Sequence, residues 1–405
     1  MGRLLFVGFD RADEKHQVCL MQPDGSVVAD LTIPNTPQGQ SELLSTIAER
    51  VPDMGQVLVA LEDPTGPFFE AFLNAGCTVY PVNPKALQRF RDRYQLSANK
   101  TDLIDSRALA DLLRKDRDAF RALRPDSELT RELRLLTRDA AELEKTQTML
   151  SNQLRDALKL AFPVVITLFN SIAAPVCLAF LAQFPSLEAA REASIQDIWE
   201  VLHQAHQPQA MDRAREVHEA LQGQQLFVDP VTARAKTEQV RTLVALLQTV
   251  HRQAVVYQRR IRVLFRQHPD REIFLSLPGA GDYLGARLAA EFGDHRDRFA
   301  DYRGVAALSG VAPVTKRSGR SCLVLYRRGC CKSFRETMFL FAFCSLTRST
   351  WASTYYRAKR TRGLKHPEAM RCLGMLWMRI IYAMWRDHQP YDEARYLAAR
   401  EAVTA

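Results

Sequence analysis

The pattern of apolar and polar positions in the first part of the chain alternates short apolar runs with helical periodicity. We expect strands at residues 4–8, 18–21, 26–31, 57–61 and 78–82. Helical patterns separate the later strands, at residues 38–50 and 68–75. The first three strands follow one another across turns, which predicts an antiparallel meander. The whole alternation predicts a mixed sheet with helices on its faces, an α/β domain over residues 1–125.

From residue 126 onward the periodicity is helical. Leu136, Leu143, Leu150 and Ala157 recur every seven residues. A second seam alternates steps of three and four, through Leu243, Leu247, Val250, Ala254, Tyr257, Ile261 and Leu264. The seams predict a helical, coiled-coil region over residues 126–270. Two interpretations have equal weight: two helices that pack within one chain, or an arm that dimerises two chains.

Residues 271–405 predict a third, helical domain. Ser276–Leu288 reads as two short helices joined by a glycine turn, a shape resembling a helix-hairpin-helix that can hold a DNA phosphate. A closing helix is expected at 391–401. The fold class is therefore α/β plus all-α. Between Lys159 and Glu188 an uncharged run is long enough for a membrane span, but Pro163 and Pro175 interrupt it and favour two short buried helices.

Composition narrows the class of protein. The chain has 405 residues and a formal net charge of +9, which suits a polyanionic partner such as nucleic acid. Its eight cysteines form no Cys-x-x-Cys pair, so we expect reduced thiols rather than disulfides or a zinc site. The N-terminal residues lack the pattern of an export signal. These features predict a cytoplasmic protein without a membrane segment.

Four carboxylates stand at positions where they can converge. Asp10 ends the first predicted strand and Glu62 ends the strand at 57–61. Asp102 and Asp105 begin a predicted helix, and their spacing of three places them on one helical face. Such a cluster can bind hard divalent cations, and two metals about 4 Å apart catalyse phosphoryl transfer. We expect Mg²⁺, for which Mn²⁺ can substitute.

Each acid also has a structural interpretation. Asp10 is compatible with a turn, and Asp102 with stabilisation of a helix N-terminus. Taken singly, each is more often structural than catalytic. The set in this order on a mixed sheet favours a metal site.

The residues at these positions resemble the DEDD transposases of the insertion-sequence one-hundred-ten family, which are related to the Piv DNA invertases. The resemblance covers most of the chain. In the N-terminal part it lies in four segments: Val7-Gly-Phe-Asp10, Glu62-Asp-Pro-Thr-Gly66, Val82-Asn-Pro84 and Asn99-Lys-Thr-Asp-Leu-Ile-Asp-Ser-Arg107. In the C-terminal part it lies in three: Leu277-Pro-Gly-Ala-Gly281, Ala307-Leu-Ser-Gly-Val-Ala-Pro313 and Arg317-Ser-Gly319.

The resemblance implies a RuvC-like member of the RNase H fold at the N-terminus, with Asp10, Glu62, Asp102 and Asp105 as metal ligands. It implies a helical C-terminal transposase domain whose nucleophile is Ser318. It further implies self-association to a dimer or tetramer with active sites shared between subunits, and a structured bridge RNA that pairs with donor and target DNA.

Two assignments stay open. Asp63 competes with Glu62 because the distance to Thr65-Gly66 is longer than the family pattern, although the strand end favours Glu62. Ser321 competes with Ser318, and the alternative is a solvated basic loop with an incidental serine. Basic residues expected to contact nucleic acid are Arg89, Arg91, Arg93, Lys100, Arg107, Lys316, Arg317, Arg320, Arg327, Arg328, Lys332 and Arg335.

The resulting hypothesis is a bacterial insertion-sequence recombinase that cuts and rejoins DNA through a transient phosphoserine link. Two rivals remain. The first is a RuvC-type, metal-dependent junction nuclease that uses water and needs no serine. The second is a non-catalytic nucleic-acid-binding protein in which the acids are structural.

Overall fold

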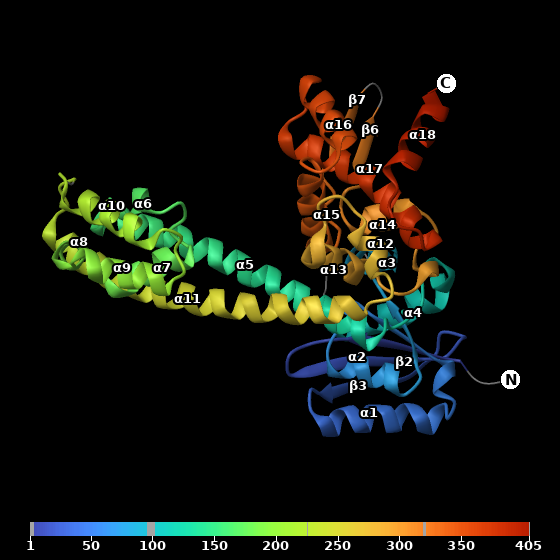
Figure 1. The fold of residues 1–405 in the computed structure, drawn as a ribbon. Coiled ribbons are helices and arrows are strands. Elements are labelled where there is room, and N and C mark those ends of the chain that lie inside the picture. The colour runs from blue at the N-terminus through green and yellow to red at the C-terminus, as the bar shows by residue number, and fades with distance from the viewer. Residues whose placement is uncertain (1–3, 95–101, 225, 319–320, 405) are drawn as a thin grey trace. The chain divides into compact units, whose positions relative to one another are not determined.

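The computed structural model describes residues 4–94, 102–224, 226–318 and 321–404. The chain forms two compact units, residues 1–125 and residues 126–405 (Figure 1). Each unit has its own hydrophobic core.

The first unit is built on a five-stranded mixed sheet. Its strands are β1 (Leu5–Asp10), β2 (Lys15–Met21), β3 (Val27–Pro34), β4 (Val57–Leu61) and β5 (Thr78–Pro81), in the order β3-β2-β1-β4-β5. The first three strands pair antiparallel, which confirms the predicted meander. β4 pairs parallel with both β1 and β5. The central strands β1 and β4 are therefore parallel neighbours, and their carboxyl ends lie at one edge of the sheet.

Helices cover both faces of this sheet. They are α1 (Pro37–Arg50), α2 (Pro67–Asn74), α3 (Pro84–Tyr94) and α4 (Asp102–Asp116), with short 3-10 turns at Met54–Gln56 and Arg117–Ala119. Alternate residues of β1 and β4 face opposite sides, as the period of two in a strand requires. Val7 and Val59 pack with α1 and α2, whereas Phe6 and Leu58 pack with α3 and α4.

Gly8 explains how closely α4 approaches β1. A Cβ atom at this position would lie 1.8 Å from the Ser106 backbone oxygen and 2.7 Å from the Ala110 backbone nitrogen. Only a residue without a side chain fits between strand and helix. Since Asp105 directly precedes Ser106, this contact also sets the distance between the start of α4 and the end of β1.

The second unit begins with two long helices, α5 (Glu128–Ala161) and α11 (Pro230–Gln267), which pack side by side (Figure 1). The interpretation as two helices packing within one chain is confirmed. Leu243, Leu247 and Ile261 of the predicted seam are buried, while Leu136 and Leu143 are half-buried. We refer to this helix pair as the arm.

The end of the arm where α5 leads toward α11 carries a small helical bundle. It contains α6 (Val165–Leu168), α7 (Pro175–Gln183), α8 (Leu187–Glu192), α9 (Ile195–Gln204) and α10 (Ala210–Gln222). The uncharged run at 159–188 thus folds into short helices that share a core with Leu154 and Leu247 of the arm. Among the described residues, no helix has both the length and the apolar character needed to cross a bilayer.

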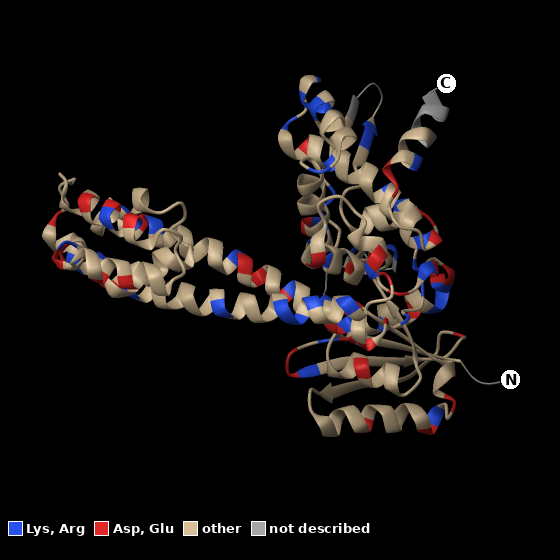
Figure 2. Cartoon of the chain, viewed as in Figure 1, with Lys and Arg blue, Asp and Glu red and all other residues tan. Residues whose placement is uncertain are grey.

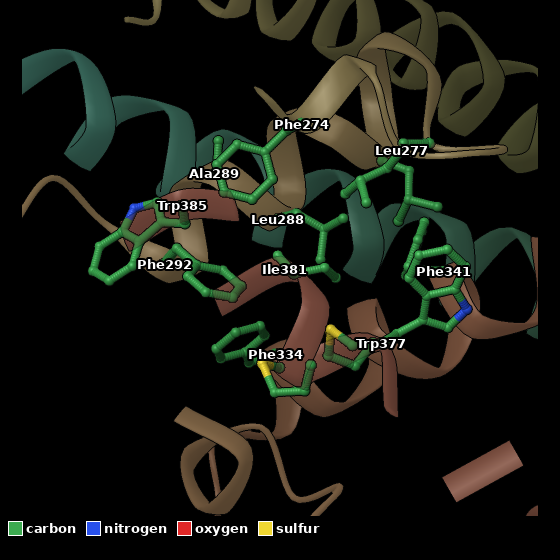
Figure 3. Close-up of a cluster of buried hydrophobic side chains, with 14 of the residues drawn as sticks. Phe274, Leu277, Leu288, Ala289, Phe292, Phe334, Phe341, Trp377, Ile381 and Trp385 are labelled. Atoms are coloured by element: carbon green, nitrogen blue, oxygen red, sulfur yellow. The ribbon is translucent and has the colours of Figure 1, made fainter. Parts of the chain in front are cut away.

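The remaining helices pack around the other end of the arm. They are α12 (Arg271–Leu275), α13 (Gly281–Phe292), α14 (Tyr302–Leu308), α15 (Lys332–Ser345), α16 (Thr350–Thr361), α17 (His366–Asp387) and α18 (Glu393–Thr404), with a 3-10 turn at Arg296–Arg298. Figure 3 shows their core, in which Phe292, Phe334 and Trp377 are fully buried. The core also includes Leu133 of α5 and Phe265 of α11, so the base of the arm is continuous with it.

Two features of this region bear on the predictions. α12 ends at Leu275 and α13 begins at Gly281, and Gly279 in the turn between them has a φ of +85°. A helix pair joined by a glycine turn is therefore present, but the prediction placed its first helix too late, because α12 ends before Ser276. An antiparallel hairpin, β6 (Val314–Ser318) and β7 (Ser321–Leu325), stands where the sequence offered a basic loop. Its β-branched residues Val314, Thr315 and Val324 are the local signal for strands.

Candidate active site

The parallel pairing of β1 and β4 brings Asp10 and Glu62 together. Phe9 pairs with Leu61, so Asp10 and Glu62 are the next residues along the two neighbouring strands. Both side chains line one pocket of about 370 Å³. A sheet therefore positions two of the predicted carboxylates from segments that are far apart in sequence.

The third carboxylate comes from α4. Asp105 lies in the first turn of that helix, lines the same pocket and is only 6% exposed. The close packing of α4 on β1 at Gly8 holds it there. Asp102 is the first residue of α4, one turn earlier, and its side chain lies outside the described part of the structure. Three of the four predicted acids thus meet at one pocket.

Another part of the pocket lining is a face of α3. Lys85, Gln88 and Arg91 follow one another at intervals of three and all line the pocket. Arg91 forms an ion pair with Asp105. The sequence placed Arg91 in a general basic cluster and missed Lys85 and Gln88. The signal that could have found Lys85 and Gln88 was their spacing on a helix that begins at Pro84, the last residue of the Val82-Asn-Pro84 motif.

Asp63 points to a different set of partners. Arg11 Nη1 donates to Asp63 Oδ2 at 2.9 Å and to Thr65 Oγ1 at 2.8 Å, and the Thr65 hydroxyl donates to Asp63 Oδ1 at 2.9 Å. Glu62 lines the pocket, whereas Asp63 does not. Asp63 therefore organises the turn before α2, which starts after Gly66 with a φ of +92°.

The donor set of the pocket matches a hard cation. Its acids offer carboxylate oxygens, the ligands that Mg²⁺ and Mn²⁺ prefer. Among the residues that the structure describes, no three His, Cys, Asp or Glu side chains lie close enough to share one metal ion. Arg91 supplies the positive charge at Asp105 in this arrangement.

Ser318 belongs to the second unit. It is the last residue of β6, it is exposed, and it pairs with Ser321 across the hairpin. Residues two apart on a strand share a face, so Lys316 lies on the face of Ser318 and Arg317 on the other. Figure 2 shows the basic character of β6. The hairpin presents a serine and a cation together to solvent.

The other predicted basic residues fall into three groups. Arg89, Arg93, Arg328 and Lys332 are exposed. Three are engaged by the protein: Arg107 donates to Asp30 and holds the pKa of that carboxyl below its usual range, Arg327 donates to the Ala312 carbonyl, and Arg335 contacts the Cys330 thiol. Lys100 and Arg320 lie outside the described residues.

Comparison with known proteins defines the class of protein. Residues 7–163 match a DEDD-type model described as a transposase, and residues 271–357 match the model of the transposase IS116/IS110/IS902 family. The first match covers the sheet and its carboxylates, and the second covers the region that contains Ser318. The mixed sheet with its flanking helices fits the DEDD, RuvC-like domain that the sequence predicted.

Full-length relatives agree with these matches. The chain is 30% identical over 403 residues to a Streptomyces coelicolor protein described as a transposase of the IS117 mini-circle. The match covers 97% of both chains. It is 28% identical to the 43.6 kDa protein of insertion element IS110 of the same organism, over 96% of this chain and 95% of the relative. It is 29% identical to the 44.8 kDa protein of IS116 of Streptomyces clavuligerus, over 96% of each. The chain belongs to the IS116/IS110/IS902 family of transposases.

Proposed function

We propose that this transposase is a serine recombinase that holds Mg²⁺ at Asp10, Glu62, Asp102 and Asp105 and attacks DNA with Ser318. The observation that carries the proposal is the convergence of Asp10, Glu62 and Asp105 on one pocket. Three acids from two strands and a helix, with Lys85 and Arg91 opposite, suit a cation and a phosphate together. The position of Glu62 in the pocket supports it over Asp63 as the second ligand.

In the chemistry proposed for Ser318, each phosphoester bond that breaks is replaced by a new phosphoester bond, so no external energy source is needed. Its hydroxyl oxygen would attack a DNA phosphorus, forming a serine phosphoester, and the bond to one sugar oxygen would break. That oxygen leaves as a hydroxyl, so the proton lost by Ser318 is balanced. A hydroxyl from another strand end would then attack the phosphoserine, rejoining DNA and releasing Ser318. A bound Mg²⁺ would supply charge stabilisation on the phosphate oxygens.

Lys316 is the cation best placed to assist Ser318. It shares the strand face of the serine, so it can contact the same phosphate. Arg317 points to the opposite face and would add salt-dependent affinity. We expect Lys316→Ala to lower the rate of strand cleavage at saturating DNA and Arg317→Ala to weaken DNA binding. Equal rates for the two variants would remove Lys316 from the proposal.

The proposed partners are donor and target DNA, a structured guide RNA and further copies of the chain, as a dimer or tetramer. Self-association is supported by apolar side chains exposed along the arm, among them Val256 at 54% and Val263 at 53%. We expect Val256→Lys with Val263→Lys to reduce the mass measured by light scattering. The wild-type mass in that variant would exclude this face of the arm.

A trapping assay tests the serine mechanism. Purified protein with its co-purifying RNA, Mg²⁺ and labelled element-end DNA are mixed, denatured and separated on a gel. We expect a covalent protein–DNA adduct that Ser318→Ala loses and Ser321→Ala retains. Cleaved DNA without an adduct, formed equally by Ser318→Ala, would instead establish a nuclease that uses water.

A further inference from the structure

The ion pair between Arg91 and Asp105 joins two walls of the carboxylate pocket. Their side chains are 22% and 9% exposed, respectively. A carboxylate withdrawn this far from water needs a positive partner, because an unpaired buried charge is strongly destabilising. Arg91 meets that need from α3, another element that lines the pocket.

A divalent cation bound to Asp105 would also neutralise the buried carboxylate, and it would do so through the oxygen that Arg91 contacts. The guanidinium Nη1 of Arg91 donates to Asp105 Oδ1, an oxygen that a metal would coordinate. The guanidinium and the metal therefore compete for one carboxylate oxygen. A carboxylate oxygen has a second lone pair, but the guanidinium charge held against it repels an arriving divalent cation. Metal binding at Oδ1 therefore favours the displacement of Arg91.

We propose that Arg91 is an exchangeable counter-ion: it neutralises Asp105 when no metal is bound and transfers to a nucleic-acid phosphate when the metal arrives. This inference rests on the proposed role of Asp105 as a metal ligand. Its consequence is that metal and nucleic acid bind cooperatively. Arg91 affects metal binding through Asp105 and does not itself bind the metal, so it is a positioning residue rather than a catalytic one.

The α3 face explains why the second partner is a phosphate. Arg91 and Lys85 line the pocket together, so a displaced guanidinium stays beside a second cation and needs an anion. A phosphate diester offers oxygens to both, and arginine binds such oxygens through paired hydrogen bonds. Arg89, two residues earlier on the same helix, is exposed and does not line the pocket. It is a matched control of equal charge.

Thermodynamic linkage gives the expected size. If a phosphate draws Arg91 away from Asp105, it lowers the dissociation constant of the metal, and the metal tightens phosphate binding by the same factor. Such coupling factors are typically about 5–150-fold. Removing Arg91 should abolish the competition and tighten metal binding even without nucleic acid.

The test measures Mn²⁺ binding to the full chain by the magnetic resonance signal of free Mn²⁺, after nuclease and high salt have removed nucleic acid. Each variant is titrated with and without a short duplex DNA, and Mn²⁺ bound by the DNA alone is subtracted. In the wild type we expect DNA to tighten Mn²⁺ binding by about fivefold or more. Arg91→Gln should bind Mn²⁺ more tightly without DNA and respond to DNA by less than about twofold.

Arg89→Gln removes an expected nucleic-acid contact outside the pocket, so it should weaken DNA binding but retain the wild-type coupling. Arg91→Lys, which keeps a charge at the pocket, should give an intermediate response. Circular dichroism checks that each variant is folded. Wild-type Mn²⁺ affinity and full coupling in Arg91→Gln would overturn the proposal. Asp105→Asn separates failure of the proposed metal site from failure of the counter-ion proposal. If this variant binds Mn²⁺ like the wild type, the proposed metal site itself is wrong. If it loses Mn²⁺ while Arg91→Gln stays unchanged, only the counter-ion proposal is wrong.

Discussion

Gly8→Ala tests whether the contact between β1 and α4 sets the geometry of the acidic pocket. The added Cβ would lie 1.8 Å from the Ser106 backbone oxygen, whereas ordinary contact begins at 3.4 Å, so α4 would have to retreat by about 1.6 Å. The opposing atoms belong to backbone and cannot rotate away. Overpacking of this kind costs about 1–3 kcal/mol. A shift of about 1 Å at a catalytic group can cost about 100-fold in rate, so Mn²⁺ affinity should fall as well.

The assay uses the distribution of tryptophan. All four tryptophans, Trp199, Trp351, Trp377 and Trp385, lie in the second unit. Fluorescence therefore reports unfolding of residues 126–405, and circular dichroism reports both units. We expect Gly8→Ala to shift part of the dichroism transition to lower urea, while the fluorescence transition stays in place.

Gly329→Ala is the matched control, because a Cβ there meets nothing within 4 Å. Wild-type stability and wild-type Mn²⁺ affinity in Gly8→Ala would refute the reasoning. They would mean that α4 does not press on β1 as the backbone distances indicate.

Three further predictions concern the second unit. Burial lowers the pKa of His268 despite nearby Asp270 and Asp294. As pH falls below about 6.5, the unfolded chain therefore takes up the proton before the folded chain does. The free energy of unfolding should then drop by about 1.4 kcal/mol for each unit by which folding lowers the His268 pKa. His268→Gln should flatten that part of the stability curve, and an unchanged slope would contradict the assignment. Burial would raise the pKa of Glu291, but hydrogen bonds from Arg138 at 3.0 and 2.9 Å hold it below its usual range. The Arg138 side chain is 41% exposed, so water partly replaces the lost partner, and Arg138→Met should cost about 1–3 kcal/mol at neutral pH in urea denaturation. Adding Glu291→Gln should recover part of that cost. A neutral single variant would show that the pair contributes little. Ser345→Ala should cost about 1–3 kcal/mol of unfolding free energy, because the buried Trp377 indole donates to Ser345 Oγ at 2.9 Å and would lose its acceptor. Thermal unfolding followed by tryptophan fluorescence measures this cost, and an unchanged transition would contradict the prediction.

Local sequence was sufficient for the strands, the long helices and the positions of the acids. Asp10 and Glu62 follow buried apolar runs, and apolar periodicity predicts where such runs end as strands. Asp102 and Asp105 could be placed on one face of a helix from their spacing alone. The seam residues Leu243 and Leu247 predicted that α11 packs on another helix, because a heptad pattern requires a partner, but they left open whether that partner lies in the same chain. These properties depend on residues within a few turns of one another.

Other features needed the tertiary structure. Sequence alone could not separate Arg91 from Arg89, since the direction of α3 depends on its packing against the sheet through Leu87 and Phe90. The surroundings of Asp63 could not be distinguished from those of Glu62 until the hydrogen bond that Asp63 accepts from Arg11, 52 positions away, was seen. The hairpin that carries Ser318 was missed because its two strands are only five residues long and show little apolar periodicity. Sequence therefore determined which chemical groups stand at the ends of elements, because element ends follow from local periodicity. Tertiary structure decided which groups share a pocket, because that depends on contacts between segments distant in the chain.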